Sequence, residues 1–323
     1  MTPLTPLTPL RVLTWHVHGS YLWYLSHVPV QWYLPVREGR PEGYGGRSGS
    51  FAWPDNVVEV PADEVGEAEY DVVLTQSVRN WETDRLDLLS PAQQRGLPRV
   101  HLEHDPPRTW PNDALHPVQD EATTLVHVTP FNALMWDSGI TPTRTVDHGV
   151  VVPGGLAWTG GTPRGITVVN NLGRRGRRLG ADVFSRIAEQ APLDLAGMAS
   201  DDFPQGIGDI PLAELHGRLP DYRFFLNPIR YTSLGLAVCE AMALGLPVLG
   251  LATTEMAAAV QNGVSGYVET DPERLVEHAC RLIEDQDEAA ELSAGALARA
   301  RERFGIERFA DDWLQVLTEA AGR

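Results

Sequence analysis

Glu240 is the residue of this sequence whose position most clearly suggests chemistry. It is the only charged residue in the helix predicted over Leu236–Leu244. Gly235 stands at the start of that helix, and Gly245 ends it, where a left-handed residue is favoured. Backbone amides at a helix start that follows a buried strand favour anions, phosphate above all. The segment therefore predicts a phosphate-binding strand–helix unit that also holds one unusual carboxylate.

A cationic segment follows the strand predicted over Gly165–Asn170 and precedes a helix from about Ala181 to Gln190. It contains four arginines: Arg174, Arg175, Arg177 and Arg178. All 26 cationic residues of the chain are arginine, against 43 acidic residues and a net charge of −17. In so acidic a protein the segment is either a solvated basic face or a clamp for a diphosphate. Its position and charge together favour the clamp.

Histidines raise the question of a metal, because His16 and His18 lie on one predicted strand and His101 and His104 on another. Their spacing fits no zinc signature, and no cysteine or carboxylate cluster accompanies them, so we predict no metal site. His104 differs from the others, since it ends a strand and precedes a Pro-Pro turn. It is either an ordinary hydrogen-bonded histidine or a catalytic one, and its position alone leaves both open.

The elements that must position these residues are short apolar strands alternating with helical patterns, which predicts an α/β protein with parallel sheets. A glycine-rich run over residues 154–161 marks the domain boundary. An arginine- and glycine-rich segment over 38–50 is either a substrate lid or a long excursion. The predicted strands cover residues 11–17, 30–34, 70–75, 98–103, 124–128, 145–146, 165–170, 193–196, 224–226 and 247–251.

Composition excludes several classes of protein. The 323 residues are 43% hydrophobic with an isoelectric point near 4.9, so we expect two globular domains and no nucleic-acid partner. No transmembrane segment is expected, and the Thr-Pro-Leu repeats of residues 1–10 indicate a flexible tail rather than a signal peptide. Two cysteines, Cys239 and Cys280, lie in helical patterns, which favours free thiols and a cytoplasmic location.

The second half of the chain resembles the retaining GT-B glycosyltransferases of family four, which use nucleotide sugars, and the first half resembles them loosely. The family's strand–loop–helix motif, its following strand and its final turn correspond to Pro228–Leu236, Glu240–Ala243, Gly245–Val248 and Asn262–Gly266. Three further places are similar to the family: His148-Gly149-Val150, Val100–His104, and Arg303-Phe304 with Trp313.

This resemblance implies two Rossmann-like domains that face each other across a cleft. An acceptor domain would cover 11–150 plus a C-terminal helix over 306–321 that crosses back to it, and a donor domain would cover 151–305. The implied reaction is retaining, metal-independent transfer of a sugar to an acceptor hydroxyl. No cofactor is implied; the donor would be a UDP- or GDP-linked sugar. The acceptor, a saccharide, lipid or small molecule, stays open.

The resemblance also assigns roles to residues. Glu240 would accept hydrogen bonds from the ribose hydroxyls, as an acceptor-only carboxylate can. Arg174 or Arg175, with Arg178, would neutralise charge on the leaving diphosphate. His104 would face the transferred sugar. The remaining residues expected around the donor are Gly19, Thr232, Ser233, Leu234, Gly235, Leu236 and Thr254.

Three departures from the family pattern bear on activity. Thr232 replaces the first glutamate of the family pair, Thr254-Glu255 replaces a Gly-Gly, and Ala258 stands where a further glutamate is expected. A hydroxyl cannot supply the charge-assisted bond of a carboxylate. Two alternatives to a transferase therefore remain: a catalytically silent protein that binds nucleotide or glycan, and an epimerase that acts on the nucleotide sugar.

Overall fold

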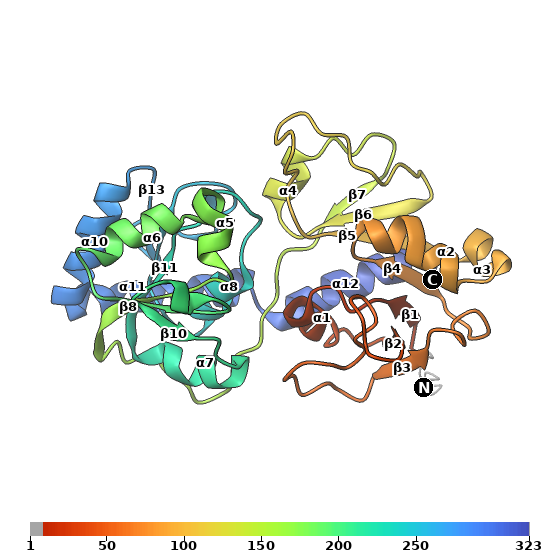
Figure 1. Ribbon diagram of the computed structural model, residues 1–323, viewed down its shortest axis with the longest axis horizontal. Coiled ribbons are helices and arrows are strands. Elements are labelled where there is room, and N and C mark those ends of the chain that lie inside the picture. Colours follow the sequence, from red (N-terminus) through yellow and green to blue (C-terminus); the bar gives the residue numbers. More distant parts are fainter. Residues whose placement is uncertain (1–8, 323) are drawn as a thin grey trace, which may run out of the picture. The chain divides into compact units, whose positions relative to one another are not determined.

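The chain is described by a computed structural model over residues 9–322 and divides into two compact units (Figure 1). Unit 1 consists of Met1–Asp147 together with Ile306–Arg323, and unit 2 is His148–Gly305. Of the tail predicted over residues 1–10, residues 1–8 lie outside the described part of the chain. Each unit is built on one parallel sheet, the arrangement that alternating strands and helices predict.

Unit 1 contains a seven-stranded sheet in the order β3-β2-β1-β4-β5-β6-β7, with parallel pairing throughout. Its strands are β1 (Arg11–Thr14), β2 (Gln31–Val36), β3 (Val57–Pro61), β4 (Val72–Thr75), β5 (Arg99–Glu103), β6 (Thr123–His127) and β7 (Thr143–Thr145). Its helices are α1 (Gly19–Leu25), a π-helical turn (Asn80–Asp84), α2 (Arg85–Leu88), α3 (Pro91–Gly96), α4 (Pro130–Met135) and α12 (Ile306–Ala320). The strand order reverses between β1 and β4, which is where open sheets of this kind bind ligands.

Helix α12 packs into the core of unit 1 although it is the last element of the chain (Figure 1). Phe309 and Trp313 are fully buried, and the indole Nε1 of Trp313 donates to the Tyr21 hydroxyl at 3.2 Å. Burying a side chain of this size stabilises the fold by roughly 1.5–3 kcal/mol. Burial also raises the pKa of Tyr21 far above its ordinary value. These contacts hold the two separated parts of unit 1 together.

Unit 2 contains a six-stranded parallel sheet in the order β10-β9-β8-β11-β12-β13. Its strands are β8 (Thr162–Val168), β9 (Leu193–Ala196), β10 (Gly206–Gly208), β11 (Tyr222–Asn227), β12 (Val248–Leu251) and β13 (Gly266–Glu269). Its helices are α5 (Leu172–Leu179), α6 (Ala181–Ala188), α7 (Leu212–Arg218), α8 (Leu236–Ala243), α9 (Met256–Ala259), α10 (Pro272–Glu284) and α11 (Gln286–Arg303). The order reverses between β8 and β11, so the loops that begin α5 and α8 flank the switch point.

The structure adds strands β3, β10 and β13, which the apolar pattern does not predict, and it specifies the conformation of two further segments. The arginine segment, expected as a loop, is the helix α5, interrupted at Gly176, whose φ of 54° and ψ of −137° are not helical. The glycine-rich segment over 38–50 makes specific contacts in this structure. The Gly46 carbonyl lies 2.6 Å from Nδ1 of His16, and the Arg40 guanidinium pairs with Glu59 at 2.7 Å. These bonds tie the segment to residues beside β1 and β3.

Candidate donor site and the facing histidine

Glu240 lies one turn into α8, and its side chain is directed into the protein, with 3% of the residue exposed. The imidazole of His216 on α7 approaches it, with Nε2 3.4 Å from Oε2 of the carboxylate. His216 is equally buried. A buried carboxylate is costly unless other groups pair with it or bond to it. Glu240 is therefore a functional candidate with a specific neighbour.

The loop before α8 is held by a histidine from the start of unit 2. Nε2 of His148 donates to the Leu234 carbonyl at 2.8 Å, and both residues are buried. Gly235 follows with extended backbone, and no side chain caps the helix. A Cβ at Gly235 would have nothing within 4 Å, so the space beside it is open. The first amides of α8 can therefore receive an anion.

The four arginines of α5 divide into two sets. Arg177 pairs with Asp182 at 2.6 Å, and the carbonyl of Arg178 accepts hydrogen bonds from the amides of Arg230 and Tyr231. Arg230 also bonds Asp182, which holds the pKa of that carboxyl below its usual value. These contacts fasten the end of α5 to the loop that leads toward Gly235. Exposed Arg174 and Arg175, by contrast, form no ion pair within the described part of the chain.

The loop after β12 contains Thr254 and Glu255 at the two positions where the family pattern has glycines. Thr254 takes the left-handed conformation with φ of 52°, which is unusual for a residue with a branched side chain. Glu255 is 2% exposed, and Arg303 of α11 pairs with it. The buried charge of Glu255 is thus balanced within unit 2. Thr253 links this loop to the preceding one, because its hydroxyl donates to the Ile229 carbonyl at 3.3 Å.

In unit 1, His104 follows β5 and lies against aromatic rings at the carboxyl edge of the sheet. Its ring centroid is 4.3 Å from that of His18 and 4.8 Å from that of Tyr21, both edge to face. Nε2 of His104 lies 3.3 Å from the side-chain oxygen of Gln76, which follows β4. Gly19 opens α1 immediately after His18. The structure thus brings His104 next to the loop of Gly19, at the switch point of unit 1.

Three other histidines of unit 1, namely His101, His116 and His127, form a buried row. Nε2 of His116 lies 3.1 Å from Glu103, and His101 belongs to the same cluster, with potential ligand atoms all within 4.8 Å. Nδ1 of His116, however, accepts the amide proton of Val118 at 3.1 Å, which places the imidazole proton on Nε2. A metal-bound histidine normally donates from its second nitrogen instead. This arrangement favours a proton shared with Glu103, and the prediction of no metal stays a prediction.

Burial changes the acidity of this row. It lowers the pKa of His101 to about 3 and that of His127 to about 4, with the neighbouring histidines adding to the effect. The Thr75 hydroxyl bonds Nδ1 of His101 at 2.7 Å. Both ring nitrogens of His127 are buried without a hydrogen-bond partner in the described structure. His101 and His127 are therefore neutral parts of the core.

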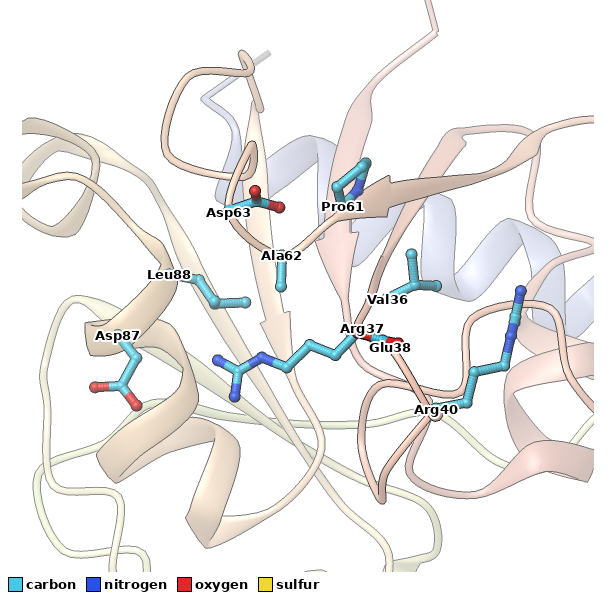
Figure 2. A pocket seen from close by; sticks show the side chains of 9 residues that line it. All are labelled: Val36, Arg37, Glu38, Arg40, Pro61, Ala62, Asp63, Asp87 and Leu88. Carbon is cyan, nitrogen blue, oxygen red and sulfur yellow. The ribbon is translucent and has the colours of Figure 1, made fainter.

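A pocket of about 620 Å³ opens in unit 1 at the carboxyl ends of β2 and β3 (Figure 2). Arg37 extends across it toward Asp87, and its guanidinium carbon lies 4.1 Å from the centre of the Tyr44 ring. No ion pair of Arg37 occurs in residues 9–322. The pocket is lined by Val36, Arg37, Glu38, Arg40, Pro61, Ala62, Asp63, Asp87 and Leu88. Its carboxylates and guanidinium groups can form hydrogen bonds with a ligand that carries hydroxyls.

Around the predicted donor residues, unit 2 adds two histidines that sequence reasoning did not assign to the site. His216 lies in a short helix where nothing in the spacing distinguishes it from a surface residue. His148 is part of a family-like segment, but its bond to Leu234 is visible only in three dimensions. Of the predicted residues, Thr232, Ser233, Leu234, Gly235 and Leu236 form the loop and first turn before Glu240, and Arg174, Arg175 and Arg178 lie on α5.

Comparison with known proteins shows which family part of the chain is similar to. Residues 187–285 match the family described as glycosyl transferases group 1. D-inositol 3-phosphate glycosyltransferase of Thermobispora bispora is 37% identical over 141 residues, which cover 41% of this chain and 32% of that protein. The corresponding enzyme 1 of Catenulispora acidiphila is 33% identical over 192 residues, covering 50% and 46%. The chain thus spans less than half the length of these curated relatives.

Solved structures agree on the fold across nearly the whole chain. Sucrose-phosphate synthase from Thermosynechococcus elongatus superposes with a TM-score of 0.70 at 14% identity, covering 96% of this chain and 98% of that one. Anabaena Alr3699/HepE in complex with UDP gives 0.70 at 12% identity, covering 96% and 100%. The chain therefore has the two-domain, Rossmann-like GT-B fold. Part of its second unit is similar to the glycosyl transferases group 1.

Within residues 9–322, no helix combines the length and the apolar character that crossing a membrane requires.

Proposed function

We propose that this protein transfers a sugar, with retention of configuration and without a required metal, from a nucleoside diphosphate donor to an acceptor hydroxyl. The observation that carries the proposal is buried Glu240 beside the uncapped start of α8, at the switch point of the unit 2 sheet. Its carboxylate would accept the ribose hydroxyls, while the α8 amides and the α5 arginines would hold the diphosphate. One solved neighbour, Anabaena Alr3699/HepE, is a complex with UDP and glucose.

The leaving diphosphate develops negative charge as the glycosidic bond breaks. Exposed Arg174 and Arg175 are available to neutralise it, and guanidinium groups bind phosphate in a bidentate manner. Arg178 would contribute from the end of the same helix. This arrangement supplies cationic charge from side chains, which is the basis for proposing a metal-independent reaction.

The acceptor would bind to unit 1. His104 would face the transferred sugar there, and the pocket containing Arg37 and Asp87 would receive an acceptor rich in hydroxyls. Cys239 and Cys280 form no disulfide within residues 9–322, which supports a reducing, cytoplasmic environment.

Calorimetric titration of UDP and GDP into wild type and Glu240→Gln tests the donor site. We expect the substitution to weaken binding of the preferred nucleotide by about tenfold or more, because a charge-assisted hydrogen bond contributes roughly 1.5–3 kcal/mol. Glu284→Gln, which changes an exposed carboxylate of α10, serves as the matched control. Equal nucleotide affinity in wild type and Glu240→Gln would rule out the assignment.

Thr232 motivates a second candidate, a protein that binds the nucleotide sugar without turnover. Incubation with a panel of UDP- and GDP-linked sugars and acceptor extracts separates the two. Tight binding with neither transfer nor donor hydrolysis would establish the silent protein. Conversion of the donor sugar without any acceptor would instead establish an epimerase.

A further inference from the structure

The Glu240 carboxylate presents a problem of orientation. It is buried on a helix whose other side chains are uncharged, and a ribose-binding carboxylate must be held at one rotamer to accept two hydroxyls. In the described structure, the imidazole of His216 lies next to this carboxylate.

The topology of unit 2 explains why these two residues meet. The chain moves from β10 to β11 through α7, and from β11 to β12 through α8. Both crossovers run in the same direction along the sheet, and right-handed crossovers in one direction lie on one face. Helices α7 and α8 are therefore neighbours on that face. His216 is buried with Leu215 on the inner side of α7, toward Glu240.

The geometry of the pair leaves room for adjustment. Nε2 of His216 lies 3.4 Å from Oε2 of Glu240, a distance within ion-pair range, but the two groups do not form a hydrogen bond, and Nε2 is buried without a hydrogen-bond partner. Leaving a buried donor unsatisfied is unfavourable. A small rotation of the carboxylate would complete the bond, and hydroxyls bound on its other side would favour that rotation.

We propose that His216 is a positioning residue for the nucleotide site: its Nε2–H binds one side of the Glu240 carboxylate and fixes the rotamer that receives the ribose hydroxyls. The proposal rests on the donor-site function proposed above and extends it to a residue outside the nucleotide's own contacts. It assigns His216 to recognition of the ribose rather than of the diphosphate.

The test compares two ligands, the preferred nucleoside diphosphate (UDP or GDP) and its 2′,3′-dideoxy counterpart, by calorimetric titration. Wild type should bind the ribose form at least about tenfold more tightly, because it alone supplies hydroxyls to Glu240. In His216→Phe this preference should fall to within about twofold. In His216→Gln, whose amide can still donate to the carboxylate, much of the preference should return.

A second histidine–carboxylate pair in unit 2, with a buried histidine and a partly exposed carboxylate, provides the control. Nε2 of His278 lies 3.1 Å from Oε1 of Glu269, and its ring stacks on Tyr267. His278→Phe removes a pair of the same kind that lies outside the predicted donor residues. We expect it to leave the ribose preference at the wild-type value, even if it lowers the melting temperature.

Each other outcome overturns the inference. If His216→Phe and His216→Gln weaken binding of both nucleotides equally and keep the ribose preference, His216 is only a packing residue. If wild type binds both nucleotides equally, Glu240 does not read the ribose and His216 has nothing to position. If wild type binds neither UDP nor GDP, the proposed function itself fails. Melting curves of the variants show whether His216→Phe folds, and His216→Gln carries the test if it does not.

Discussion

The carboxyl edges of the two sheets follow the same topological plan but carry different chemistry. In unit 2 the edge presents an uncapped helix start, exposed arginines and the buried carboxylate of Glu240. In unit 1 it presents His104 between aromatic rings, a row of buried histidines, and a pocket with Arg37 and Asp87. One edge is suited to a diphosphate with a ribose, and the other to uncharged sugar and hydroxyl groups. The fold supplies the position, and the side chains decide the ligand.

The largest effect is expected from the exposed arginines of α5, because they define the anionic character of the unit 2 edge. Arg174→Ala combined with Arg175→Ala should weaken nucleoside diphosphate binding by about 100–1,000-fold, since each charge-assisted contact contributes roughly 1.5–3 kcal/mol. Calorimetric titration measures it. Arg177→Ala, which removes a guanidinium already paired with Asp182, should stay within about threefold of wild type. Equal losses of nucleotide affinity in the two variants would contradict the division of the α5 arginines into two sets.

His104 tests whether the unit 1 edge acts in the chemical step. His104→Ala should lower kcat by about 100-fold, within the range for loss of a group at the reacting centre. The dissociation constant for UDP or GDP should change by no more than about twofold, because the residues proposed to contact the nucleotide lie in unit 2, apart from Gly19. Steady-state kinetics with the identified acceptor, together with titration, separates the two. A large loss of nucleotide affinity would contradict the assignment.

The buried histidines of unit 1 make its stability depend on pH. The folded pKa values of His101 and His127, about 3 and about 4, lie below the usual 6.5, so the unfolded chain binds more protons in this range. Stability is therefore full above pH 6.5 and is lost as the pH falls toward these folded values. At pH 5 the expected loss is about 2 kcal/mol per histidine. Urea unfolding from pH 7.5 to 5 measures it, and His127→Phe should reduce the slope by one proton.

His148 links the start of unit 2 to the loop before α8. Substituting it tests whether nucleotide binding needs that loop to be held in place. His148→Ala removes the bond to the Leu234 carbonyl and leaves that buried acceptor unpaired. Nucleotide affinity should fall by about tenfold, the cost of one buried hydrogen bond that orders the loop. Unchanged binding by titration would show that the loop is rigid without His148.

The smallest effect is expected at the pocket of unit 1. Asp87→Asn should raise KM for the acceptor by about three- to tenfold through loss of one hydroxyl contact. Donor hydrolysis in the absence of acceptor should be unchanged. Acceptor kinetics that match wild type would exclude this pocket as the acceptor site.

Local sequence patterns predicted the helices whose ends are marked by glycines and the strands formed by apolar runs. The helix expected over Leu236–Leu244 is α8 (Leu236–Ala243), because Gly235 and Gly245 mark its ends, and the strand expected over 193–196 is β9. Contacts distant in sequence decided the rest. The arginine segment is helical partly because Arg230 and Tyr231 bond its last turn. Strand β10 contains two glycines and exists through its pairing with β9.

The residues of the candidate site also fall into two groups: some could be predicted from the local sequence, and the others depend on contacts between distant parts of the chain. The Gly235–Glu240 segment could be found from residue types and spacing, since a phosphate-binding turn is a local structure. His216 could not, because its significance comes from α7 and α8 sharing one face of the sheet. The capacity of Arg174 and Arg175 for a ligand likewise depends on which neighbouring arginines are already paired with acids.

The position of α12 in unit 1 has a consequence for how the chain is made. Unit 2 is inserted between Asp147 and Ile306, so a ribosome finishes it before the helix that carries Phe309 and Trp313 emerges. Domains usually fold in the order of synthesis, but here the contact surface of Tyr21 stays uncovered until α12 has been synthesised. Unit 2 is therefore free to complete its core first.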